Sequence, residues 1–231
     1  MNHKFQVITV AALAALSAGT AQAQSATSSS WTNAFSQPVA QPNIFKGGAI
    51  LYQTHSETTG ITGIGIPPGA DAETGDAWTL LLTYERLLTP NFGIEFVLGW
   101  PPTIKAKATG SVSFLGEDVL EAKNVAPTLL FNYHFGNAGD KFRPYLGAGV
   151  NYTHFTDIKT SLPVESVEMS DSWGWAVQAG FDYQFTPQWG LFASIARVDV
   201  KTDLVAVGST VLKTTIDFKP ITYSFGVSYR F

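Results

Sequence analysis

Hydrophobic and polar residues alternate along several segments of this chain, most regularly at its C-terminal end. Aliphatic or aromatic side chains occupy every second position from Ile221 to Phe231. The positions between them hold small or polar residues, the last of which is Arg230. Because successive side chains of a β-strand point to opposite faces, this pattern predicts a strand with one aromatic and one polar face. An aromatic face that meets lipid is typical of a membrane β-barrel.

Seven further segments precede this strand. They are 44–54, 78–84, 92–100, 125–135, 146–152, 173–185 and 189–200. Alternation is weak in the first, and in the seventh the pattern does not decide whether Phe192 or Ile195 points inward. An even count of eight fits the smallest barrels. We therefore expect an all-β, eight-stranded antiparallel transmembrane β-barrel with long extracellular loops and short periplasmic turns.

The connections between these segments alternate in length, which supports the barrel. The long ones are 55–76, 102–122, 155–171 and 201–214, and the short ones are 88–91, 136–141 and 186–188. Two of the short turns share the order Thr-Pro-x-aromatic-Gly, beginning at Thr89 and Thr186. Outer-membrane barrels place long loops outside the cell and tight turns in the periplasm, so the order predicts the two ends of the barrel.

The N-terminal region and the composition are consistent with export. Residues 1–23 have a basic start, an apolar stretch and a small-x-small site, which predict a signal peptide. Residues 24–43 are rich in Ser, Thr, Gln and Pro and predict a periplasmic leader, so the barrel is expected over 44–231. The chain has no cysteine and no apolar run of about 18 residues that would predict a membrane-spanning helix. Its net charge of −4 and dispersed basic residues argue against a nucleic-acid partner.

If the apolar rows face lipid, the opposite rows face the lumen. Near the short turns these rows contain charged residues, which predict a polar, closed floor: Glu85, Glu95, Arg143, Asp182 and Arg230, accompanied by Asn132, His134 and Gln184. Unpaired buried charges are costly, so the three acids are expected to pair with the two arginines. Such a network either fills a small barrel or forms an ion or proton path, and the first is favoured.

Closer to the long loops, the inward row becomes small or apolar. The candidate channel-lining residues are Leu81, Val97, Ala126, Thr128 and Leu130. They predict either a hydrophobic pocket open to the outside or ordinary packing, and the pattern does not decide between these.

Prolines interrupt the third and fourth predicted strands. Trp100, Pro101 and Pro102 end one strand, and Pro127 lies within the next. Since proline cannot donate to a β-ladder, we consider a lateral gate between these strands. The alternative is that the prolines only end strand pairing where the loop leaves the membrane.

Two stretches resemble the OmpW family of outer-membrane proteins. These are 127–136, which reads PTLLFNYHFG, and 141–152, which reads KFRPYLGAGVNY; the C-terminal Gly-x-x-Tyr-Arg-Phe also resembles the family ending. The resemblance implies an eight-stranded barrel with a hydrophobic channel, chiefly lined here by Leu130, that passes small hydrophobic solutes and releases them sideways into outer-membrane lipid. It also implies that the C-terminal strand is recognised by the barrel-assembly machinery.

Two other classes of function stay open. A surface receptor, adhesin or structural barrel would act through the long loops. A rim enzyme would need a nucleophile and an acid near His55 or His154, with Ser56, Glu57 and Asp157 close in sequence. No spacing requires this, so we assign no catalytic residue, metal ligand or cofactor. Three surface acids, Glu165, Glu168 and Asp171, could attract a divalent ion between lipopolysaccharides.

Overall fold

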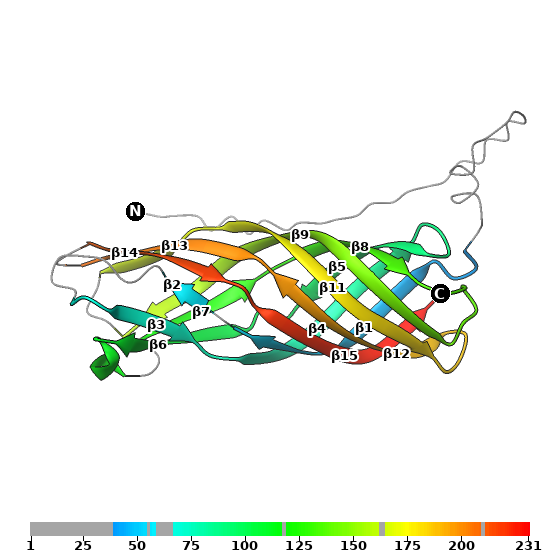
Figure 1. The fold of residues 1–231 in the computed structure, drawn as a ribbon, viewed down its shortest axis with the longest axis horizontal. Helices are drawn as coiled ribbons and strands as arrows, with labels where there is room; N and C mark the ends of the chain where they lie inside the picture. Colours follow the sequence, from blue (N-terminus) through cyan, green and yellow to red (C-terminus); the bar gives the residue numbers. More distant parts are fainter. Residues whose placement is uncertain (1–38, 55, 59–66, 117–118, 162–164, 209–210) are drawn as a thin grey trace, which may run out of the picture.

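The computed structural model describes residues 39–231 except 55, 59–66, 117–118, 162–164 and 209–210. The predicted signal peptide and most of the predicted leader lie outside the described residues. Figure 1 shows an elongated β-structure whose C-terminus lies at the end that carries the short turns. We call this end the floor end, and the opposite end, where the long connections lie, the outer end. Among the described residues, no helix has the length and hydropathy needed to cross a bilayer.

Eight antiparallel strands close into a barrel. They are β1 (Asn43–Gln53), β4 (Ala77–Leu87), β5 (Phe92–Gly99), β8 (Thr128–His134), β9 (Phe142–Thr160), β11 (Ser172–Gln184), β12 (Trp189–Val198) and β15 (Ile221–Arg230). Their order is β11-β12-β15-β1-β4-β5-β8-β9, and pairing of β11 with β9 closes the ring. The predicted eight-stranded barrel is therefore confirmed.

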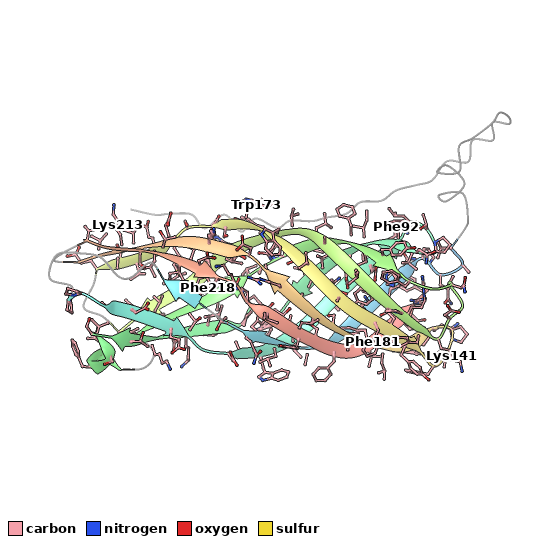
Figure 2. The ribbon with its side chains drawn as sticks, in the orientation of Figure 1. Phe92, Lys141, Trp173, Phe181, Lys213 and Phe218 are labelled. Carbon is pink, nitrogen blue, oxygen red and sulfur yellow. The ribbon has the colours of Figure 1, made fainter. Side chains whose placement is uncertain are left out.

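The alternating pattern fixes which side of each strand faces outward. The aliphatic and aromatic rows are exposed on the barrel wall, and Phe92, Trp173 and Phe181 point away from it in Figure 2. On β12 the structure decides what the pattern left open. Phe192 is buried inside the barrel at 3% exposure, whereas Ile195 is 43% exposed on the outer wall.

The long connections are largely composed of strands, a conformation that the sequence pattern left open. They contain β2 (Ser56–Thr58), β3 (Ala70–Thr74), β6 (Thr103–Gly110), β7 (Leu120–Val125), β10 (Ser166–Met169), β13 (Val200–Val207), β14 (Val211–Phe218) and the 3-10 helix η1 (Ser113–Leu115). Strand β7 pairs with the outer half of β9, β6 pairs with β7, and β3 pairs with β6. Strands β10, β13, β14 and β2 form a second sheet in that order. These strands, with β9 beyond residue 153, form the outer extension, which continues the barrel along its long axis (Figure 1).

The outer extension has charged side chains outside and apolar side chains inside. Cross-strand ion pairs on its outer surface join Lys107 to Glu73 (3.1 Å) and Lys105 to Glu121 (3.0 Å). Its interior holds a buried cluster of Ala122, Phe155, Val200, Ile216 and Phe218. The period-two alternation therefore extends beyond the barrel, but with a polar outer face instead of a lipid-facing one.

Candidate functional site

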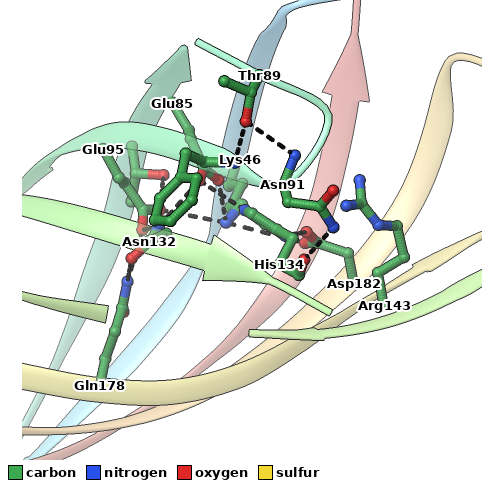
Figure 3. Close-up of polar contacts among 12 residues, drawn as sticks. Lys46, Glu85, Thr89, Asn91, Glu95, Asn132, His134, Arg143, Gln178 and Asp182 are labelled. Carbon is green, nitrogen blue, oxygen red and sulfur yellow. Dashed lines mark hydrogen bonds and ion pairs between the residues drawn. The ribbon is translucent and has the colours of Figure 1, made fainter. Parts of the chain in front are cut away.

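A buried lysine lies at the centre of the barrel floor. Lys46 extends inward from β1 and is 1% exposed. Its Nζ lies 3.0 Å from Glu85, 3.3 Å from Glu95 and 3.8 Å from Asp182 (Figure 3). Because three buried carboxylates share this ammonium group, Lys46 supplies compensating charge to all of them.

Amide and imidazole groups complete the floor. Asn132 Nδ2 donates to Glu85 Oε1 (3.0 Å) and Glu95 Oε2 (2.8 Å), and Gln178 Nε2 donates to Glu95 Oε2 (2.7 Å). His134 Nε2 lies 2.7 Å from Glu85 Oε1. We call Lys46, Glu85, Glu95, Asn132, His134, Gln178 and Asp182 the floor network. Its members come from five strands of the barrel wall, so the network links these strands across the lumen.

The expected pairing of the acids with two arginines is largely wrong. Arg143 is buried, but its Nη2 donates to the carbonyl of Pro90 (2.6 Å) and to no carboxylate. Arg230 forms one longer ion pair, 3.7 Å from Asp182. The lysine was missed because β1 alternates weakly, and Gly47 and Gly48 directly after Lys46 hide the inward row.

The floor network also contains the one group of possible metal ligands found in the described part of the chain. Ligand atoms of Glu85, His134 and Asp182 lie within 4.8 Å of one another. The Lys46 ammonium already lies against the two acids and supplies positive charge there. A cation at this position would be repelled by Lys46, so the residues present do not favour a metal ion.

A cavity of about 70 Å³ lies in the lumen above the floor network. The structure places all five predicted channel-lining residues in its wall: Leu81, Val97, Ala126, Thr128 and Leu130. Phe192, Tyr145 and Ile50 complete much of the remaining surface, together with several Ser, Thr and Asn side chains. We call this the lumen cavity.

A second cavity, of about 100 Å³, lies within the outer extension. Its wall is almost entirely apolar and includes Ile104, Ala106, Ala122, Leu204, Ile216 and Phe218, the last of which is labelled in Figure 2. We call this the outer cavity. The sequence did not predict it, because it forms between strands that the sequence assigned to loops.

A narrow space of about 10 Å³ lies between these cavities. Ile104, Phe155 and Phe218 belong to its wall and to that of the outer cavity, whereas Tyr52 and Val200 belong to its wall and to that of the lumen cavity. We call it the neck. The rings of Phe155 and Phe218 lie 6.2 Å apart, centroid to centroid. A space of this size holds about one water molecule at most, so the neck is the smallest of these three spaces.

The barrel wall has a gap in its hydrogen bonding between β5 and β8. Their paired register ends at Val97 opposite Thr128, and pairing resumes where the Asn124 amide donates to the Pro102 carbonyl (3.1 Å). In the described residues between these points, no backbone hydrogen bond joins the two strands. Gly99 and Ala126 lie in this interval, and both also line the lumen cavity.

The predicted gate residues surround this gap but do not all cause it. Trp100 is 73% exposed, and its amide donates to Leu80 of β4, on the side away from the gap. The Pro127 carbonyl accepts from the Tyr152 amide of β9 (3.0 Å). Since the N–H and C=O of one residue face the same neighbouring strand, the donor that Pro127 lacks belongs to the β8–β9 ladder. Pro101 and Pro102 lie on the β5 side of the gap.

The outer rim shows a different arrangement from the one considered for an enzyme. His154 Nδ1 lies 2.6 Å from Asp171 Oδ1, and the Tyr152 hydroxyl donates to Asp171 Oδ2 (2.6 Å). Both hydrogen bonds lower the pKa of the Asp171 carboxyl, and the one from Tyr152 has the larger effect. Asp157 instead accepts from Lys123 (2.7 Å).

Other candidates at the outer end are not brought together. Asp171 is bound to Tyr152 and His154, and it forms no group of metal ligands with Glu165 and Glu168 among the described residues. His55 lies outside the described residues, as do the side chains of Ser56 and Glu57.

A closed eight-stranded barrel with an apolar outer wall and a polar interior floor is an integral outer-membrane protein. The chain belongs to the OmpW family, whose model matches residues 42–231. It is 32% identical over 157 residues to outer membrane protein W of Vibrio cholerae, which covers 65% of this chain and 72% of that protein. The dibenzothiophene metabolism operon protein PahQ of Pseudomonas aeruginosa is 26% identical over 166 residues, 71% of this chain and 76% of that protein.

The fold has also been seen in solved structures. The crystal structure of the outer membrane protein OprG from Pseudomonas aeruginosa superposes with a TM-score of 0.77 at 27% identity, and it covers 83% of this chain and 96% of that chain.

Proposed function

We propose that this protein is an outer-membrane conduit for small hydrophobic molecules, which enter through the outer extension and leave sideways into the membrane. The observation that carries this proposal is the contrast between the apolar outer part of the interior and its charged floor. The outer cavity, the neck and the lumen cavity follow one another, and below them lies the ion-paired floor network. A water-filled pore would instead need an open floor.

The upper part of the path favours apolar molecules over ions. The wall of the outer cavity is almost entirely apolar, so an ion there would lose its hydration without gaining a partner. An apolar molecule loses only its contact with water and is stabilised. Movement through the neck requires the rings of Phe155 and Phe218 to turn, because the space between the two cavities is only about 10 Å³.

The lower part of the path favours exit to the side. Below the lumen cavity, passage would disrupt the contacts of Lys46 with Glu85 and Glu95, and breaking a buried ion pair costs about 3–5 kcal/mol. The gap between β5 and β8 offers another way out. At Gly99 and Ala126 the wall consists of small residues without a ladder between them, and the lipid lies directly outside.

The relatives support the class of solute. The PahQ protein is named for dibenzothiophene metabolism, and dibenzothiophene is an apolar aromatic compound. Transfer of this class of solute to the present chain rests on the family match over residues 42–231 and on the apolar outer cavity.

Lateral exit is tested by closing the gap from the lipid side. Leu98 and Pro127 are the first residues of the gap, next to the last paired positions Val97 and Thr128. The chain has no cysteine, so Leu98→Cys with Pro127→Cys can be joined selectively by a short dimaleimide. We expect cross-linking to lower the uptake of an apolar solute by cells about tenfold, as expected for about 1.4 kcal/mol.

A control pair uses the same β5 position. Leu82→Cys with Leu98→Cys joins β4 to β5, where the ladder is already paired. Cross-linking this control should leave uptake unchanged. Equal uptake before and after cross-linking of the gap pair would rule out the lateral exit and leave the rest of the path in place.

A further inference from the structure

Two polar groups of the neck have no hydrogen-bond partner. Asn124 on β7 is 9% exposed, and its Oδ1 is buried without a donor. Tyr52 on β1 lies in the wall of the neck and of the lumen cavity, and its hydroxyl forms no hydrogen bond with any described residue. Two side chains in the wall of the neck therefore carry one acceptor and one hydroxyl without a partner.

Two other polar side chains along the path form hydrogen bonds within the protein. Thr54, also in the wall of the neck, donates to the carbonyls of Thr74 (3.1 Å) and Gly75 (2.8 Å). Asn151, in the lumen cavity, donates to Thr128 Oγ1 (2.7 Å) and accepts from Thr153 Oγ1 (2.7 Å). Most buried polar groups of native proteins are paired in this way, so two unpaired groups at one constriction require an explanation.

We propose that the neck selects apolar molecules that carry a single hydroxyl group, which are alcohols and phenols. A hydroxyl both donates and accepts, so it can donate to Asn124 Oδ1 and accept from the Tyr52 hydroxyl. The proposal rests on the conduit function above and names the class of solute that the conduit prefers.

The place of these groups on the path makes them suited to selection. The outer cavity, which precedes the neck on the path, is almost entirely apolar. A solute hydroxyl therefore loses its hydrating water in the outer cavity and gains hydrogen-bond partners at the neck. Because the neck is the smallest of the three spaces, a hydrogen bond formed there lowers the barrier to passage. A pure hydrocarbon leaves both groups unpaired. Because unpaired buried polar groups are costly, a site of this kind strongly favours the hydroxyl compound over the hydrocarbon.

The test compares p-cresol with p-xylene, which differ by a hydroxyl in place of a methyl group. Initial uptake of each labelled compound is measured in cells with and without the protein, and the ratio of the two protein-dependent rates is calculated. The variants are Tyr52→Phe, Asn124→Leu and the double variant, each of which removes a polar group with little change of shape. Tyr223→Phe is the matched control, because Tyr223 is exposed on the outer wall.

We expect the wild type to favour p-cresol, and each single variant to lower the cresol-to-xylene ratio roughly fivefold, as for one neutral hydrogen bond. Uptake of p-xylene and the ratio of the Tyr223→Phe control should stay at the wild-type value. An unchanged ratio in the double variant would overturn the selection while leaving the conduit intact. Absence of protein-dependent uptake of either compound in the wild type would overturn the conduit, and the selection with it.

The ratio is insensitive to the amount of folded protein, since both compounds use the same barrel. If the double variant fails to insert, Tyr52→Phe, which removes one oxygen atom, decides the question in the same way.

Discussion

The two ends of one barrel interior are filled in opposite ways. At the floor end, Lys46 forms ion pairs with three carboxylates inside the barrel. In the outer extension the inward positions are alanines, aliphatic residues and phenylalanines, and they leave a cavity of about 100 Å³. The comparison teaches that inward side chains of opposite charge draw together inside a small barrel, whereas apolar side chains leave a cavity between them.

The same comparison explains the direction of the proposed path. Along the proposed path, a hydrophobic molecule meets the apolar outer cavity, then the neck and the lumen cavity with their mixed polar and apolar walls, and then buried charge. The gap at Gly99 and Ala126 lies beside the lumen cavity, above the floor network. The ladder between β5 and β8 is thus missing just beyond the paired positions Glu95 and Leu130, on their outer side.

The largest effect is expected from removing the cation of the floor. Lys46→Met leaves Glu85, Glu95 and Asp182 without their shared partner and should lower the free energy of unfolding by about 3–5 kcal/mol. Urea-induced unfolding in micelles measures this. Lys123→Met removes an exposed lysine, also paired with an acid, and should cost about 1 kcal/mol or less. Equal losses in the two variants would show that the floor does not depend on Lys46.

A smaller effect is expected from the amide that supports the floor. Gln178 donates to Glu95 (2.7 Å) and to Asn132 Oδ1 (2.8 Å). Gln178→Leu should lower the free energy of unfolding by about 1.5–3 kcal/mol, as expected for a hydrogen bond to a charged group. Gln188→Leu, on an exposed turn, is the control and should be near neutral. A neutral Gln178→Leu variant would indicate that the floor relies on charge alone.

The apolar end is tested by filling it. Ala106→Phe places a ring in the outer cavity and should reduce uptake of an apolar solute about tenfold, which corresponds to about 1.4 kcal/mol. Lys107→Phe introduces the same ring on the opposite face of β6, where the side chain is exposed. Uptake by this control should match the wild type. If Ala106→Phe transports normally, the outer cavity is not on the path.

The smallest effect concerns the charged outer surface of the outer extension. The hydrogen bond from Lys123 lowers the pKa of the Asp157 carboxyl. A lowered folded-state pKa stabilises the protein above the unfolded-state pKa of about 3.9, and this contribution is lost as the pH falls through the folded-state value. The difference in unfolding midpoint between wild type and Asp157→Asn should be present at pH 6 and vanish well below pH 4. A difference that persists there would exclude the ion pair as its cause.

Period-two alternation was enough to predict the barrel, because one face of each strand meets lipid. It also identified Glu85, Glu95 and Asp182 as lumen residues. The pattern failed at Lys46, whose strand carries two consecutive glycines and little alternation. It could not pair the charges either, since their partners depend on the shear and width of the closed barrel rather than on sequence distance.

The outer extension and the neck could not be predicted from the sequence for a related reason. Strands β3, β6 and β13 face water outside and a cavity inside, so their apolar residues are small and spaced among charges that resemble a loop. The neck joins Tyr52 at the end of β1 with Asn124 on β7. Only the closed fold brings these two positions to one constriction.

The most direct test of an apolar path above a closed floor combines ion conductance with uptake of an apolar solute. Leu130 lies in the lumen cavity at 3% exposure, and Leu130→Arg places a charge on the path, whereas Leu130→Met keeps it apolar. We predict low ion conductance for the wild type and both variants, with uptake lost only in Leu130→Arg. Undiminished uptake by a folded Leu130→Arg barrel, or high ion conductance of the wild type, would contradict the proposed path.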